Sequence, residues 1–154
     1  MINDIILFLA SFLIWIMFLG LGILWFIDGR IRKEQVLHSI FASFIAWIVA
    51  EFIKQAFHIA RPFQVNGLKP LTITTPLSPA FPSSHAAVVF ALAVTVWFHN
   101  KKAGLLFLIL AVVVSVARVV ANVHYPSDVF VGAVIGSFIA LIIEKVHLPL
   151  RGGK

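Results

Sequence analysis

Five apolar segments alternate with short polar connections along the chain, and this pattern predicts a bundle of membrane-spanning helices. The segments cover roughly Ile5–Ile27, Val36–Phe57, His85–Phe98, Ala103–Val120 and Val129–Val146. A helix that crosses a bilayer needs about 20 mainly apolar residues, and four of these segments approach or exceed that length. The third covers only about 21 Å of a hydrocarbon core of about 30 Å, so we expect its first residue to lie below the membrane surface.

One long connection, from His58 to Pro82, separates the second and third segments. It holds five of the seven prolines of the chain. Because proline cannot continue a helix or a sheet ladder, this composition predicts an extended loop with little regular structure. Apolar residues such as Phe63 and Leu71 indicate a loop that lies partly in the membrane interface, and long loops of this kind are often functional.

The composition supports the membrane class. Of 154 residues, 61% are hydrophobic and 12% are charged, whereas soluble domains are about half apolar and about a quarter charged. The length fits one all-α domain over residues 1–154, and the lack of cysteine excludes disulfides and thiolate metal ligands. The net charge of +6 is scattered between apolar runs, so we expect no nucleic-acid partner.

The positions of lysine and arginine predict the orientation of the bundle. With five spans, one face would hold eight cations, namely Arg30, Arg32, Lys33, Lys101, Lys102, Lys145, Arg151 and Lys154. The positive-inside rule makes that face cytoplasmic. The opposite face would hold four, namely Lys54, Arg61, Lys69 and Arg118. We therefore expect a multi-pass protein of the cell membrane in which this second face is extracytoplasmic.

Small residues recur every four positions on the last segment, at Gly132, Gly136 and Ala140. Small side chains on one helix face let neighbouring helices approach closely. This stripe therefore predicts a packing seam and no chemistry.

Ionisable side chains at the edges of apolar segments are costly and need a reason to be there. Snorkelling to the interface would explain any one of Lys54, Arg61 and Arg118. It does not explain why all three fall on the sparsely charged face together with His85 and His124. A phosphate site does, because guanidinium groups match phosphate oxygens in charge and geometry.

His124 and Asp128 lie four residues apart at the start of the last segment, with Ser127 as a candidate N-cap. A carboxylate that accepts one ring N–H of histidine leaves the other nitrogen free as a nucleophile. A capped helix with an ordinary loop histidine would show the same pattern, so the pair alone does not decide between the two interpretations.

The run Pro82-Ser83-Ser84-His85 opens the third segment. Ser83 or Ser84 could cap this helix, whose free N–H groups would form a cradle for phosphate. His85 would lie in the first turn, where it could protonate a leaving group.

Together, Lys54-x6-Arg61-Pro62, Pro82-Ser83-Ser84-His85 and Arg118-x5-His124-x3-Asp128 resemble the three-part signature of the type-2 phosphatidic acid phosphatase superfamily. The resemblance implies a polytopic helical membrane enzyme that works without a metal or other cofactor. It implies that His124 attacks phosphorus to form a phosphohistidine, that Asp128 orients His124 and that His85 protonates the leaving group. The residues implied to hold phosphate are Lys54, Arg61, Ser83, Arg118 and the backbone of Ser84.

The chain departs from the usual signature at two positions. Ser84 replaces a usual glycine and could crowd the backbone contact to phosphate, and Ala117 replaces a usual serine and removes a hydroxyl. Neither change touches a group that transfers protons. Glu51, three residues before Lys54, is interpreted as a charge partner of that lysine inside the bundle.

The resemblance implies a lipid phosphate or diphosphate as substrate. Small members look like undecaprenyl-diphosphate phosphatases, or like phosphatases of phosphatidylglycerophosphate or phosphatidate. We favour the polyprenyl diphosphate because an outward-facing site suits recycling of a carrier lipid, and Lys69 could bind its distal phosphate. The rival of another class is a transporter, whose ionisable residues would lie at several depths. The pattern predicts no oligomeric state.

Overall fold

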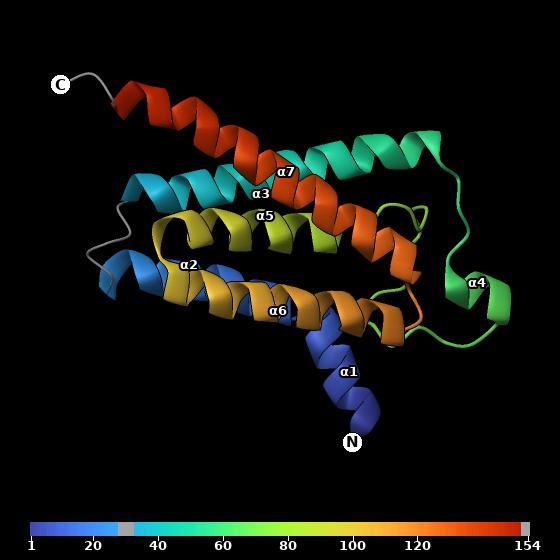
Figure 1. The fold of residues 1–154 in the computed structure, drawn as a ribbon. Helices are drawn as coiled ribbons and strands as arrows, with labels where there is room; N and C mark the ends of the chain where they lie inside the picture. The colour runs from blue at the N-terminus through green and yellow to red at the C-terminus, as the bar shows by residue number, and fades with distance from the viewer. Residues whose placement is uncertain (28–32, 152–154) are drawn as a thin grey trace.

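Helices make up the whole of the regular structure in the computed structural model, which describes residues 1–27 and 33–151 (Figure 1). They are α1 (Ile2–Ser11), α2 (Leu13–Ile27), α3 (Lys33–Ala56), α4 (Pro62–Asn66), α5 (Ser84–His99), α6 (Lys101–Val120) and α7 (Pro126–Arg151). The described residues contain no strand. The predicted all-α fold class is confirmed.

Helix α5 is the central element of the bundle and packs against α3, α6 and α7 (Figure 1). Its small side chains make this possible: Ala87 and Ala91 face Ala42, Ala46 and Ala50 of α3 in one core cluster. On the other side, larger residues of α5 pack with residues of α2 and α6 in a second cluster. Helix α5 thus carries its first turn into the interior of the bundle.

The first apolar segment is not one helix, as the pattern predicted, but two. Helices α1 and α2 meet at Phe12 with a bend of 53°. Sharp bends usually follow from proline or glycine, and neither is present at this point, so the pattern contains no signal for it. Residues next to the break bond to other elements: the carbonyl of Ala10 accepts from Arg118 at 3.1 Å, and the side-chain Oγ of Ser11 accepts from N–H of Ile73 at 3.4 Å.

The five predicted spans all fall on helices, but one of these helices, α5, is short. Helices α3, α6 and α7 each contain a stretch long and apolar enough to cross a membrane, and α1 with α2 would make a fourth, bent span. Helix α5 has 16 residues and is shorter than a full span. It does not continue past His99, because the side chain of Asn100 caps α6 through the N–H groups of Lys102 and Ala103.

The two ends of the bundle differ in charge as predicted. Lys54, Arg61 and Arg118 lie at the end where α3 and α6 finish and α7 begins, whereas Lys101 and Lys102 lie at the opposite end (Figure 1). Arg30, Arg32 and Lys154, three of the cations expected on the cytoplasmic face, lie outside the described residues.

The long connection between α3 and α5 contains one short helix, α4, which the proline-rich composition did not predict. Pro62 occupies its first turn, where a missing N–H costs nothing. The loop is tied to the α6–α7 turn: N–H of Leu71 donates to the carbonyl of Ala121 at 2.9 Å, and Asn66 and Asn122 exchange side-chain hydrogen bonds of 2.8 and 3.0 Å. The loop therefore covers the end of the bundle that holds the candidate site.

The predicted seam of small residues brings α7 close to α5. A Cβ added at Gly136 would lie 2.1 Å from the carbonyl oxygen of Ala87, and one added at Gly132 would lie 2.4 Å from that of Ser83. Because these neighbours are backbone atoms, no side-chain movement can make room. Gly132 thereby lets α7 approach the turn that begins α5.

We expect Gly136→Ala to destabilise the protein by about 1–3 kcal/mol, because the added methyl group must push α7 away from α5. Thermal unfolding of the detergent-solubilised protein measures this. Gly22→Ala is the matched control, since a Cβ there meets nothing within 4 Å and the gain in helix propensity is similar. Equal melting temperatures for the two variants would contradict the close contact.

Candidate active site

A cavity of 540 Å³ opens at the end of the bundle covered by the loop. Six of the eight residues predicted for catalysis or phosphate binding line it, namely Lys54, Arg61, Ser84, His85, Arg118 and His124. The other two, Ser83 and Asp128, lie behind this wall and are 0% and 1% exposed. The cavity continues along an apolar wall formed by α2 and α3. A single cavity is therefore lined by cationic side chains at one end and by apolar side chains at the other.

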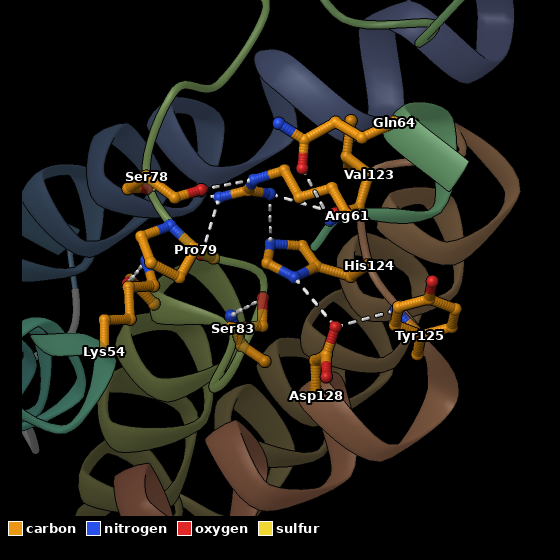
Figure 2. Close-up of polar contacts among 12 residues, drawn as sticks. Lys54, Arg61, Gln64, Ser78, Pro79, Ser83, Val123, His124, Tyr125 and Asp128 are labelled. Carbon is orange, nitrogen blue, oxygen red and sulfur yellow. Dashed lines mark hydrogen bonds and ion pairs between the residues drawn. The ribbon is translucent and has the colours of Figure 1, made fainter. Parts of the chain in front are cut away.

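Arg61 is 2% exposed, and its guanidinium is held almost entirely by backbone carbonyls (Figure 2). Its Nε donates to the carbonyl of Ser78 at 2.8 Å, Nη1 donates to that of Val123 at 2.9 Å, and Nη2 donates to that of Pro79 at 3.2 Å. The second donor of Nη1 faces Nε2 of His124 at 3.4 Å. Arg61 thus fastens the loop over the cavity and places a fixed positive charge beside His124.

His124 lies between Arg61 and Asp128, as Figure 2 shows. Its Nδ1 is 3.4 Å from Oδ2 of Asp128, and the same carboxylate oxygen accepts from the backbone N–H of Tyr125 at 2.8 Å. Because helix α7 begins at Pro126, Ser127 lies in its first turn, and the prediction that Ser127 is the N-cap is wrong. The carboxylate favours a proton on Nδ1, which leaves the lone pair of His124 on Nε2, the ring nitrogen that faces Nη1 of Arg61.

Burial lowers the pKa of His124 from 6.5 to about 4, against the opposing effect of Asp128. The same cause, loss of hydration, lowers the pKa of Arg61, which stays charged at neutral pH. A histidine whose pKa is lowered is neutral above that value. The ring of His124 therefore keeps its lone pair across the physiological range.

We expect kcat/KM to persist in mild acid and to fall only as the pH approaches about 4, where His124 gains a proton. An unperturbed histidine would lose half its neutral form at pH 6.5. The measurement is a pH–rate profile taken with a lipid monophosphate and with a lipid diphosphate. If the acidic fall in kcat/KM reflects a group of the enzyme, its midpoint must be the same for the two lipids. A common midpoint near pH 6.5 would contradict the effect of burial on the pKa of His124.

Arg118 approaches the cavity from the last turn of α6 and is 6% exposed. Its Nη1 donates to the carbonyl of Ala10 at 3.1 Å, so the bend between α1 and α2 supplies an acceptor for this buried guanidinium. Its Nε has no acceptor among the described residues. A buried guanidinium with donors left over is well suited to an oxyanion. Ala117 packs with Ala10 where α1 crosses α6.

The Pro-Ser-Ser-His turn builds the start of α5. Oγ of Ser83 accepts from N–H of Ala86 at 3.5 Å, so Ser83, one of the two predicted candidates, is the N-cap. The backbone N–H of Ser83 donates to the carbonyl of Asp128 at 3.0 Å, which fixes this turn to the start of α7. His85, in the first turn, then lines the cavity.

Lys54, Glu51 and Ser84 form a hydrogen-bonded triangle at the cavity wall. Nζ of Lys54 donates to Oε1 of Glu51 at 2.8 Å and to Oγ of Ser84 at 2.5 Å, and that hydroxyl donates to Oε1 of Glu51 at 2.6 Å. The predicted ion pair between Glu51 and Lys54 is confirmed. The side chain of Ser84 points to α3 and hydrogen-bonds to two of its residues. The serine at this usual glycine position therefore adds contacts that a glycine could not make.

Several groups of the site were not predicted. They are the carbonyls of Ala10, Ser78, Pro79 and Val123, which hold the two arginines. Every residue has a backbone carbonyl, so the residue types in a sequence do not indicate which carbonyls will bind the arginines. Lys69, which was expected to bind a distal phosphate, is exposed on the loop and is not among the residues that line the cavity.

The chain is similar in sequence to a known protein family and to several named relatives. The model of the PAP2 superfamily matches residues 35–150. An undecaprenyl-diphosphatase of Sulfolobus acidocaldarius is 32% identical over 95% of this chain and 71% of its own length. The bacitracin transport permease protein BcrC of Bacillus licheniformis is 29% identical over 93% of this chain and 70% of its own length.

Two solved structures have a similar fold. The crystal structure of Aquifex aeolicus LpxE aligns with a TM-score of 0.68 and 27% identity, covering 94% of this chain and 84% of its own. A transmembrane PAP2 type phosphatidylglycerolphosphate phosphatase from Bacillus subtilis aligns with a TM-score of 0.67 and 19% identity, covering 99% of this chain and 78% of its own. The helical architecture described above is therefore shared with membrane phosphatases.

Proposed function

Because the chain belongs to the PAP2 superfamily and is a membrane lipid phosphatase, we propose that it hydrolyses a polyprenyl diphosphate of the undecaprenyl type. One observation carries this proposal: a single cavity joins Lys54, Arg61 and Arg118, the two histidines and an apolar wall. The name of the Sulfolobus relative supports the diphosphate substrate.

In the first chemical step, Nε2 of His124 attacks the terminal phosphorus. A P–N bond forms, and the bond from phosphorus to the bridging oxygen breaks with both electrons going to that oxygen. His85 donates a proton to it when the leaving group is an alkoxide. The products of this step are a phosphohistidine and a lipid monophosphate from a diphosphate, or a lipid alcohol from a monophosphate.

In the second step, His85 takes a proton from a water molecule that attacks the phosphohistidine. The P–N bond breaks, Nε2 regains its electron pair, and inorganic phosphate is released. Lys54, Arg61 and Arg118, with the backbone of Ser84, neutralise the negative charge on phosphorus oxygens in both steps. Asp128 keeps the proton on Nδ1, so that Nε2 is the nitrogen left free to act as the nucleophile.

The apolar wall is suited to the first isoprene units of the lipid. It is formed by Ile14, Trp15 and Phe18 of α2 and by Ile40, Phe44 and Trp47 of α3. Contact with such a wall contributes about 0.8 kcal/mol per buried CH₂ group. The chain would leave sideways between α2 and α3 while its headgroup reaches the short helix α5.

The transport name of the Bacillus licheniformis relative raises the alternative of a transporter. A transport pathway would carry polar groups at several depths of the bundle. The charged residues that line the cavity lie together at one end, and beyond them its lining is almost entirely apolar. This arrangement favours hydrolysis at a fixed depth.

We propose that the cavity opens on the extracytoplasmic side. A cysteine at Thr74, exposed on the loop, should react with an impermeant thiol reagent added to intact cells, and one at Lys102, exposed at the start of α6, should not. The chain has no cysteine of its own, so the wild type is an unlabelled control. The reverse labelling pattern would place the site on the cytoplasmic side.

The test of function is phosphate release by the purified protein in detergent from a matched set of substrates. The set contains undecaprenyl diphosphate, undecaprenyl phosphate, phosphatidylglycerophosphate, phosphatidate and a water-soluble phosphate ester. We expect the highest kcat/KM for undecaprenyl diphosphate and poor turnover of the soluble ester, which lacks the chain that the apolar wall would bind. A preference for phosphatidylglycerophosphate or phosphatidate would overturn the choice of lipid, and a preference for the soluble ester would also overturn the role of the wall.

A further inference from the structure

Among the described residues that line the cavity, Glu51 is the only carboxylate. It lies on α3 between Trp47, which belongs to the apolar wall of the cavity, and Lys54, which belongs to its cationic end. Its side chain is 35% exposed, whereas that of Lys54 is 6% exposed. This carboxylate takes no part in the proposed proton transfers, and a negative charge beside a phosphate site needs an explanation.

The contacts of Glu51 supply one. Its Oε1 accepts both from Nζ of Lys54 and from Oγ of Ser84, at 2.8 and 2.6 Å. Ser84 stands where the signature usually has a glycine, and a glycine has no side chain that could link Glu51 to the first turn of α5. The ammonium group of Lys54 is therefore held by α3 and by α5 at the same time.

We propose that Glu51 is a positioning residue that sets how tightly the site holds phosphate, by fixing Lys54 and balancing its charge. This inference rests on the proposed phosphatase function. With Glu51 ionised, Lys54 is already paired with a carboxylate. A bound phosphate therefore meets the guanidinium groups of Arg61 and Arg118, whose acceptors among the described residues are not carboxylates, and a lysine that is shared. The arrangement holds a phosphoryl group firmly enough to react and still allows inorganic phosphate to leave.

Removing the carboxylate should strengthen the binding of phosphate. In Glu51→Gln, the amide can still accept from Lys54, but one unit of negative charge on the wall of the cavity is lost. We expect orthovanadate and inorganic phosphate to bind about tenfold more tightly, as the loss of a unit charge from this wall predicts in a medium of ordinary protein polarity. We also expect kcat and KM to fall together, because slower product release lowers both.

The experiment measures orthovanadate binding by thermal shift on the full-length protein in detergent, together with phosphate inhibition of lipid hydrolysis. Asp4→Asn is the matched control: it removes one negative charge from an exposed side chain on α1 that is paired with the terminal ammonium group. Ser84→Gly, which keeps the ion pair and removes the link to α5, should give a smaller gain in affinity than Glu51→Gln.

A double-mutant cycle with Lys54→Gln shows whether Glu51 acts through the lysine. In the Lys54→Gln background, Glu51→Gln should change vanadate affinity far less than it does in the wild-type background. Unchanged or weaker vanadate binding by Glu51→Gln, with vanadate binding intact in the wild type, would overturn the inference and leave the phosphatase proposal standing. A wild type that neither binds vanadate nor releases phosphate from a lipid would overturn both.

Discussion

Turnover should fall by at least about 10⁴-fold when His124 is replaced by alanine or by asparagine, because no other group can form the covalent bond to phosphorus from the same position. Asparagine is the sharper of the two changes, since its amide N–H can replace the Nδ1–H of the ring toward Asp128. Phosphate release from a lipid substrate measures the loss, and thermal unfolding checks that the bundle is intact.

Asp128→Asn distinguishes orientation of the nucleophile from the nucleophile itself. The ring of His124 would survive but would favour the wrong tautomer, so we expect a rate about two orders of magnitude above that of the His124 variants. His58→Asn is the matched control, an exposed histidine at the same end of the bundle that is not among the residues lining the cavity. Wild-type activity in His124→Ala would refute the phosphohistidine mechanism.

The sequence was sufficient to predict which ionisable residues come together at one end of the bundle. Apolar segments of defined length located α3, α5 and α6 to within a few residues, and the spacing from Arg118 to His124 and Asp128 placed the histidine and its carboxylate together. These predictions depend on local periodicity and on the high cost of a buried charge, which are both visible in a single chain.

The remaining features depend on contacts between distant segments. The bend at Phe12 has no proline or glycine to announce it, and its effect is to place the carbonyl of Ala10 against Arg118, 108 residues away. The same holds for the loop, where the carbonyls of Ser78 and Pro79 enclose Arg61. The role of Ser84 required the position of Glu51 on another helix, so the sequence showed the departure from glycine and not its use.

His85→Gln should separate the two classes of lipid substrate, because they differ in the group that leaves. A lipid monophosphate expels an alkoxide, which needs a proton as the bond to phosphorus breaks, so kcat/KM should fall by about 10²–10⁴-fold. A lipid diphosphate expels a phosphate monoester, whose second pKa is about 6. That leaving group is stable without the proton, and we expect a loss of only about tenfold.

The second step sharpens this test. Hydrolysis of the phosphohistidine needs His85 as a base whichever lipid was cleaved, so the variant acting on a diphosphate should form the intermediate quickly and hydrolyse it slowly. Rapid-mixing experiments should then show a burst of one lipid monophosphate per enzyme molecule, followed by slow phosphate release. An equal loss of kcat/KM with both lipids, without a burst, would mean that His85 binds phosphate and does not transfer the proton. The comparison therefore assigns the role of His85 and, through the leaving group, tests the diphosphate proposal independently of the substrate panel.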